Sequence, residues 1–128
     1  MRPAVVVLAL LVPLAVAGCA ADTGAPARTA ERFVAAVTAR QGEAACALLA
    51  ARAAQKLPDK GQTCAQALVE LGLREGPVVS AVVWGDEAQV RTTRDTIFLH
   101  RFGGGWRVRA AGCTPRGDDL PYDCEVES

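Results

Sequence analysis

Four of the five cysteines constrain the fold of this 128-residue chain more than any other feature; they are Cys46, Cys64, Cys113 and Cys124, an even set that lies beyond Cys19 and the N-terminal apolar segment. A small domain buries little apolar surface, and an even number of cysteines in a small exported chain indicates disulfide bonds. Four cysteines allow three pairings. The pairing with the shortest loops joins Cys46 to Cys64 and Cys113 to Cys124, so we expect one disulfide bond in each half of the domain.

A metal or redox role for these cysteines is not expected. No two of them have the C-x2-C spacing of zinc and dithiol sites, and the only histidine, His100, is isolated in the sequence. Asp118 and Asp119 lack the spacing of a calcium-binding loop. The sequence therefore predicts neither a metal nor a cofactor.

The first 18 residues have the pattern of an export signal. Met1 and Arg2 give a short positive start, and an almost uninterrupted apolar run follows from Ala4 to Ala15. This run is closer to the ~7 to 15 residues of a signal-peptide core than to the ~20 residues that span a bilayer. We therefore expect residues 1–18 to be removed on export.

The end of this segment, Val16-Ala17-Gly18-Cys19, resembles the lipobox of bacterial lipoproteins. The resemblance implies that Cys19 is acylated and becomes the first residue of the mature chain, which places it on the outer face of the cytoplasmic membrane. Two or more acyl chains hold a protein stably on a bilayer. An ordinary secretory signal that happens to contain a cysteine is the alternative. Residues 19–28, which are mostly small, predict a flexible tether.

The charge balance excludes one broad class of function. Fourteen basic and fourteen acidic residues cancel, so the chain lacks the cationic surplus of a nucleic-acid-binding protein. With 51% hydrophobic and 22% charged residues, the chain has enough apolar material for a small core. We expect one globular domain over residues 29–128.

Hydrophobic periodicity predicts an α+β domain in which N-terminal helices pack on a curved four-stranded antiparallel sheet. Thr29 is the expected cap of the first helix, which buries Ala30, Phe33, Val34 and Val37 on one face. The first predicted helix starts at residue 30 and ends at Gly42, and the other two predicted helices are 43–55 and 63–71. The predicted strands are 78–84, 87–93, 95–102 and 105–112.

Several of these segments resemble small actinobacterial lipoproteins with an NTF2-like or cystatin-like domain. The resemblance lies in the helix residues Glu31-Arg32-Phe33, the strands Asp95-Thr96-Ile97-Phe98-Leu99 and Gly105-Trp106-Arg107-Val108, and the ending Gly112-Cys113-Thr114-Pro115 with Pro121-Tyr122-Asp123-Cys124. It implies the same α+β fold and, for most such proteins, no assigned activity.

His100 is the candidate catalytic residue. NTF2-like enzymes often use a histidine with an acidic partner, so the resemblance implies His100 with Asp95 as a proton-transfer pair. On a regular strand these two residues lie on opposite faces, whereas a general base must lie within hydrogen-bond reach of its partner. A partly exposed strand histidine without a catalytic role is the alternative.

Three arginines are candidates for a partner or anion surface: Arg91, Arg107 and Arg109, which alternation predicts on one solvent-exposed face of the sheet. The acidic tail could instead neutralise them, through Asp118, Asp119, Asp123, Glu125 and Glu127. The aromatic residues Trp84, Phe98, Phe102 and Trp106 either line a small pocket or belong to the core.

The leading hypothesis is a non-enzymatic, membrane-anchored domain that binds a protein partner or a small ligand outside the cytoplasmic membrane. The alternative is a small lyase, isomerase or hydrolase that uses His100 as a base in a cone-shaped pocket. Self-association through the sheet is a third hypothesis. No nucleic-acid partner is expected.

Overall fold

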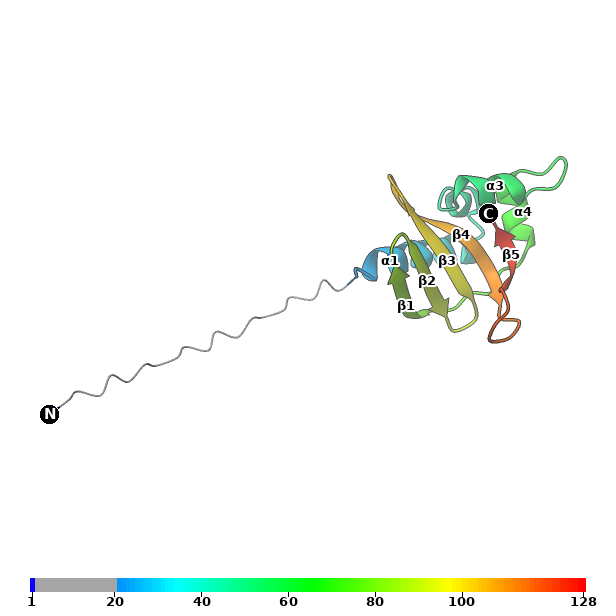
Figure 1. The fold of residues 1–128 in the computed structure, drawn as a ribbon. Helices are drawn as coiled ribbons and strands as arrows, with labels where there is room; N and C mark the ends of the chain where they lie inside the picture. Colours follow the sequence, from blue (N-terminus) through cyan, green and yellow to red (C-terminus); the bar gives the residue numbers. More distant parts are fainter. Residues whose placement is uncertain (2–20) are drawn as a thin grey trace.

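A computed structural model describes Met1 and residues 21–128 of the chain (Figure 1). The predicted signal peptide, residues 1–18, and the predicted acylation site, Cys19, are therefore outside the described residues apart from Met1. In the part of the chain that is described, no helix combines the length and the apolar character needed to cross a bilayer.

Four helices precede one antiparallel sheet of five strands in the order β1-β2-β3-β4-β5 (Figure 1). The helices are α1 (Gly24–Thr38), α2 (Gly42–Cys46), α3 (Ala51–Lys56) and α4 (Cys64–Glu70). The strands are β1 (Val78–Trp84), β2 (Glu87–Thr92), β3 (Thr96–Phe102), β4 (Gly105–Thr114) and β5 (Asp123–Glu127). The predicted α+β class is confirmed. The predicted strand count is wrong, because the chain end pairs with β4 and buries Val126 opposite Ala111.

The first helix begins at Gly24, so Thr29 is not its cap. Pro26 is tolerated in the first turn, where backbone N–H groups have no helical partner, and its ring is buried. Thr29 is also buried, and its hydroxyl donates to the Ala25 carbonyl oxygen at 3.3 Å. Residues 24–28, expected as part of the tether, therefore belong to the packed domain.

The predicted helix over residues 43–55 is interrupted between α2 and α3. Residues 48–50 form a parallel bridge to β4 instead: the Val108 N–H donates to the Leu48 carbonyl at 2.8 Å, and the Ala50 N–H donates to the Val108 carbonyl at 2.7 Å. These two hydrogen bonds pair the backbone N–H and carbonyl groups of Val108, which precedes the residues of β4 that pair with β5. Tertiary pairing thus overrides the helix propensity of the alanines.

Both predicted disulfide bonds are present. Cys46–Cys64 joins α2 to the start of α4, and Cys113–Cys124 joins β4 to β5. The start of α4 is fixed by a capping box, in which the Thr63 hydroxyl accepts from the Gln66 N–H and the Gln66 side chain accepts from the Thr63 N–H.

The core lies between α1 and one face of the sheet. Phe33 from α1 packs with a layer of fully buried strand residues, Val90, Ile97, Leu99, Val108 and Val126. The strand β3 therefore turns Ile97 and Leu99 toward the helices and Phe98, His100 and Phe102 toward the opposite face, which we call the open face.

A bulge in β4 corrects one predicted face. Leu99 is opposite Val108, but Phe98 is opposite Ala110, so Arg109 is the extra residue of β4. On a regular strand Ala110 would lie on the same side as Trp106 and Val108, but the bulge places Ala110 opposite Phe98. The bulge returns Ala111 to the core side, where it is fully buried.

Candidate functional site

On the open face, His100 and Arg109 both contact Glu87, a residue that the sequence analysis missed. Glu87 and His100 are directly opposite in the β2–β3 register, and the His100 Nδ1 lies 2.7 Å from the Glu87 Oε1. The Nη1 of Arg109, which the bulge displaces, donates to both carboxylate oxygens of Glu87 at 3.1 Å. Only the strand register could have identified Glu87 as their shared partner.

Burial raises the pKa of Glu87, but the hydrogen bonds from His100 and Arg109, together with their charges, outweigh this effect and hold the pKa below its usual value of 4.5. A lowered carboxyl pKa means that ionised Glu87 stabilises the fold. This contribution is complete above the unfolded pKa and is lost as the pH falls through the lower folded pKa.

Replacing Glu87 by glutamine should lower the free energy of unfolding by about 0.5 to 1 kcal/mol at neutral pH, because the cluster is partly solvent-exposed. The difference from the unmodified protein should shrink as the pH falls below 4.5 and the native carboxylate takes up its proton. Urea unfolding of both proteins at several pH values measures this. A difference that stays constant down to about pH 3 would contradict the ionic role of Glu87.

Asp95 is not the partner of His100. Its Oδ1 accepts from the backbone N–H groups of Thr96 at 2.7 Å and Cys113 at 2.9 Å, and its Oδ2 accepts from the Gly112 N–H at 2.9 Å. Asp95 therefore ties the turn before β3 to β4. The predicted His100–Asp95 pair is wrong, and a His100–Glu87 pair takes its place.

The arginines of the sheet divide into two groups by their partners. Arg101 binds Asp86 at 2.8 Å, Arg109 binds Glu87, and the Nη1 of Arg107 donates to the Ala47 carbonyl at 2.6 Å. Arg91, in contrast, has no side-chain hydrogen bond or ion pair within residues 21–128. The structure thus separates Arg91 from Arg107 and Arg109, with which the sequence grouped it.

Arg91 instead lines a groove with Arg74 and Arg94, and we call this concavity the arginine groove. Arg74 follows α4, Arg91 is in β2 and Arg94 is in the turn between β2 and β3. All three side chains are exposed, and none has an ion-pair partner in the described part of the chain. The groove has a volume of about 760 Å³ and its other lining residues include Ser80, Gln89, Thr93, Thr96, Thr114 and Tyr122.

The far side of the arginine groove is held in place by Tyr122. Its ring packs edge-on against Phe98 with 5.1 Å between the ring centroids, and its hydroxyl lies 3.3 Å from the Gln89 Nε2 donor. Among the described residues, Asp95 is the one carboxylate that lines the groove, and its oxygens accept hydrogen bonds from backbone N–H groups rather than from an arginine. The groove therefore presents three cationic side chains and one carboxylate.

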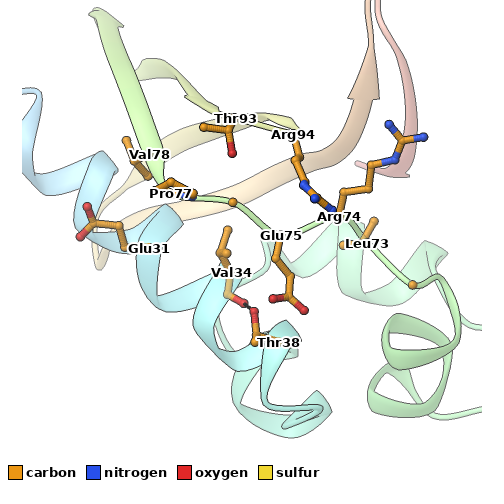
Figure 2. Close-up of a pocket in the computed structure, with 12 residues that line it drawn as sticks. Glu31, Val34, Thr38, Leu73, Arg74, Glu75, Pro77, Val78, Thr93 and Arg94 are labelled. Atoms are coloured by element: carbon orange, nitrogen blue, oxygen red, sulfur yellow. Dashed lines mark hydrogen bonds between the residues drawn. The ribbon is translucent and has the colours of Figure 1, made fainter.

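Arg74 and Arg94 also border a second cleft, of about 960 Å³, between α1 and the chain that leads into β1. Figure 2 shows both arginines at one end of this cleft and Glu31 toward the other. Glu75 lies between Glu31 and the two arginines in this view, but Glu75 forms no ion pair with either arginine among the described residues. Arg74 and Arg94 therefore lie where the two concavities meet.

The structure supports neither the predicted neutralisation of the arginines by the acidic tail nor the predicted aromatic pocket. The ion pairs of residues 21–128 include no carboxylate from the acidic tail, so the tail does not neutralise the arginines by direct pairing. The four aromatic residues do not gather in one pocket, because Trp84 and Phe102 are 49% and 48% exposed and Trp106 packs against the core. The described residues also contain no cluster of three or more side chains suited to hold a metal ion.

Comparisons of the chain with protein families, with curated proteins and with solved structures find no match. The geometry of the open face is thus the basis for assigning a function.

Proposed function

We propose that this chain is an exported, lipid-anchored, non-enzymatic domain that binds an acidic ligand in the arginine groove. One observation carries the proposal: Arg74, Arg91 and Arg94 line one groove without an ion-pair partner in residues 21–128, whereas the neighbouring Arg101 and Arg109 are neutralised. Three guanidinium groups that share a concavity repel one another, and an anion removes that repulsion.

The chemistry of the groove suits a carboxylate or phosphate group. A guanidinium presents a planar fork of N–H donors that matches such groups in a bidentate geometry. Hydroxyl groups from Ser80, Thr93 and Tyr122 add neutral donors along the same groove. The volume of about 760 Å³ is within the range of small-ligand sites. We therefore favour a small acidic molecule as the ligand.

The proposed location rests on the sequence. The apolar segment before residue 19 and the lipobox-like Val16–Cys19 support export and acylation of Cys19, and disulfide bonds are typical of oxidising compartments outside the cytoplasm. The NTF2-like or cystatin-like assignment is part of the same proposal. The order of elements supports it, since helices precede a single antiparallel meander.

A second candidate function is acid–base catalysis by His100, which the 2.7 Å contact with Glu87 favours because a carboxylate can orient a histidine base. His100 does not line the arginine groove, however, and it lies on an open surface rather than in an enclosed site. Replacing His100 by alanine should therefore leave ligand binding in the groove unchanged, and would abolish a reaction only if this second function holds.

Titration of the detergent-solubilised protein with citrate, a polyvalent anion, tests the proposal. Calorimetry should detect binding, and the Arg91→Ala and Arg94→Ala variants should each bind at least about ten-fold more weakly, as expected when one charge-assisted contact is lost. Arg101→Ala is the matched control, because this arginine is already paired with Asp86, and it should bind citrate like the unmodified protein.

No citrate binding at millimolar concentration, or an equal loss in the Arg101→Ala control, would contradict the proposal. The native mass of the membrane-extracted protein gives a second test. Extra mass from a small molecule, lost in Arg91→Ala, supports a small ligand. Extra mass from a second polypeptide would replace the small ligand by a protein partner.

A further inference from the structure

We infer that a second basic concavity, at the start of α1, contacts the headgroups of anionic phospholipids. Arg28 and Arg32 of α1 line it together with Gly104, Gly105, Trp106 and Arg107 from the β3–β4 hairpin, and its volume is about 620 Å³. We call it the membrane-proximal concavity. The inference rests on the proposed function in one respect, which is that Cys19 carries the lipid anchor.

The membrane-proximal concavity lies at the end of the domain that follows the predicted anchor. Because α1 begins at Gly24, the chain from Cys19 to the helix can extend at most about 18 Å. Ala25, one residue into the helix, already lines the membrane-proximal concavity, and Arg28 follows in the next position on that side. An anchor on Cys19 therefore brings this end of the domain, rather than the arginine groove, to the bilayer surface.

The membrane-proximal concavity is lined by positively charged side chains. Arg28 and Arg32 are four residues apart, so they project from the same side of α1 and repel each other. Both are exposed, and neither has an ion-pair partner in residues 21–128. Two carboxylates, Asp22 and Glu31, are close to these arginines in the chain; Asp22 accepts the Gly24 N–H at 2.9 Å, and Glu31 lines the cleft described above. Among the described residues, no acidic side chain lines the membrane-proximal concavity itself.

A tryptophan, Trp106, lines the membrane-proximal concavity together with the arginines. Trp106 is half-buried, and its ring lies 5.6 Å from the guanidinium carbon of Arg101. Indole rings favour the headgroup level of a bilayer, where an apolar body and a polar N–H are both accommodated. Arg107 completes the basic lining, because its Nη1 binds a backbone carbonyl and no carboxylate. Arginines with an interfacial tryptophan fit an anionic lipid surface.

Quenching of Trp106 by brominated lipids tests the inference. The chain has two tryptophans, so Trp84→Phe leaves Trp106 as the reporter. The acylated protein is reconstituted in vesicles of phosphatidylcholine alone or of equal parts phosphatidylcholine and phosphatidylglycerol, with bromine near the headgroups. Quenching should be at least about two-fold stronger in the anionic vesicles and should weaken at high salt.

A pair of charge-reversal variants provides the control. Arg28→Glu with Arg32→Glu should remove the difference between the two kinds of vesicle, whereas Arg91→Glu with Arg94→Glu changes the net charge equally and should keep it. All four positions are exposed, so both variants should fold, and unchanged thermal unfolding checks this. Equal quenching in both vesicles, or equal losses in both variants, would overturn the inference.

The same samples separate the two proposals. Denatured mass shows whether Cys19 is acylated, and citrate titration reports on the arginine groove. An acylated, citrate-binding protein with no lipid-dependent quenching would overturn the headgroup contact alone. A protein without acyl chains would overturn both the anchor and the headgroup contact.

Discussion

Reduction of both disulfide bonds should unfold the domain at ambient temperature. Cys46–Cys64 and Cys113–Cys124 close loops with sequence separations of 18 and 11 residues. In the chain-entropy account, loops of this size stabilise the fold by about 3 kcal/mol each. Their sum, about 6 kcal/mol, is comparable with the whole stability of a domain of this length. Circular dichroism and urea unfolding with and without reductant measure the effect.

The two bonds should not act alike when they are removed singly. The helices α2 and α4 have 5 and 7 residues, too short to be stable alone, so Cys46→Ser with Cys64→Ser should loosen them first. Cys113→Ser with Cys124→Ser should release β5, because backbone pairing with β4 is the other main contact that holds it. Hydrogen exchange of each double variant shows whether the helices or β5 become less protected. A reduced protein that unfolds at the same urea concentration as the oxidised protein would refute the predicted effect of reduction.

Replacing Asp95 by alanine should lower the free energy of unfolding by about 3 kcal/mol. Three backbone N–H groups, those of Thr96, Gly112 and Cys113, donate to its carboxylate at 2.7 to 2.9 Å. Hydrogen bonds to a charged group contribute about 1.5 to 3 kcal/mol each, and water can reach part of this site and compensate some of the loss. Urea unfolding measures the change.

Asp95→Asn is the matched control for this prediction. Its single side-chain oxygen can keep one or two of the three hydrogen bonds, so it should lose about half as much stability as Asp95→Ala. An Asp95→Ala protein as stable as the unmodified one would show that the turn before β3 holds without this carboxylate.

The fold was predictable where local signals decide it. The disulfide pairing follows from loop length, and the first four strands follow from β-branched runs between glycines, within a residue or two of their ends. Long-range contacts decide the rest. The bridge of residues 48–50 to Val108 divides a helix that alanine propensity makes continuous, and β5 forms because Val126 fills a place beside Ala111 that no local pattern reveals.

The site was only partly predictable for the same reason. The sequence identifies His100 as a candidate base, but the partner of His100 depends on the β2–β3 register, which places Glu87 opposite it. The bulge at Arg109 directs that arginine to Glu87. Arg74 reaches the groove from the end of the helical half, and neither its position in the sequence nor its neighbours indicate this.

The direction of β3 separates the two basic concavities. The arginine groove lies by the turn where β3 starts, and the membrane-proximal concavity lies by the hairpin where β3 ends. The 7 residues of β3 extend about 20 Å. An anionic bilayer repels acidic molecules only within about one screening length, roughly 8 Å at physiological salt. If the hairpin end contacts the membrane and the groove binds an acidic ligand, as proposed, that ligand is held beyond the zone in which the charge of the membrane would repel it.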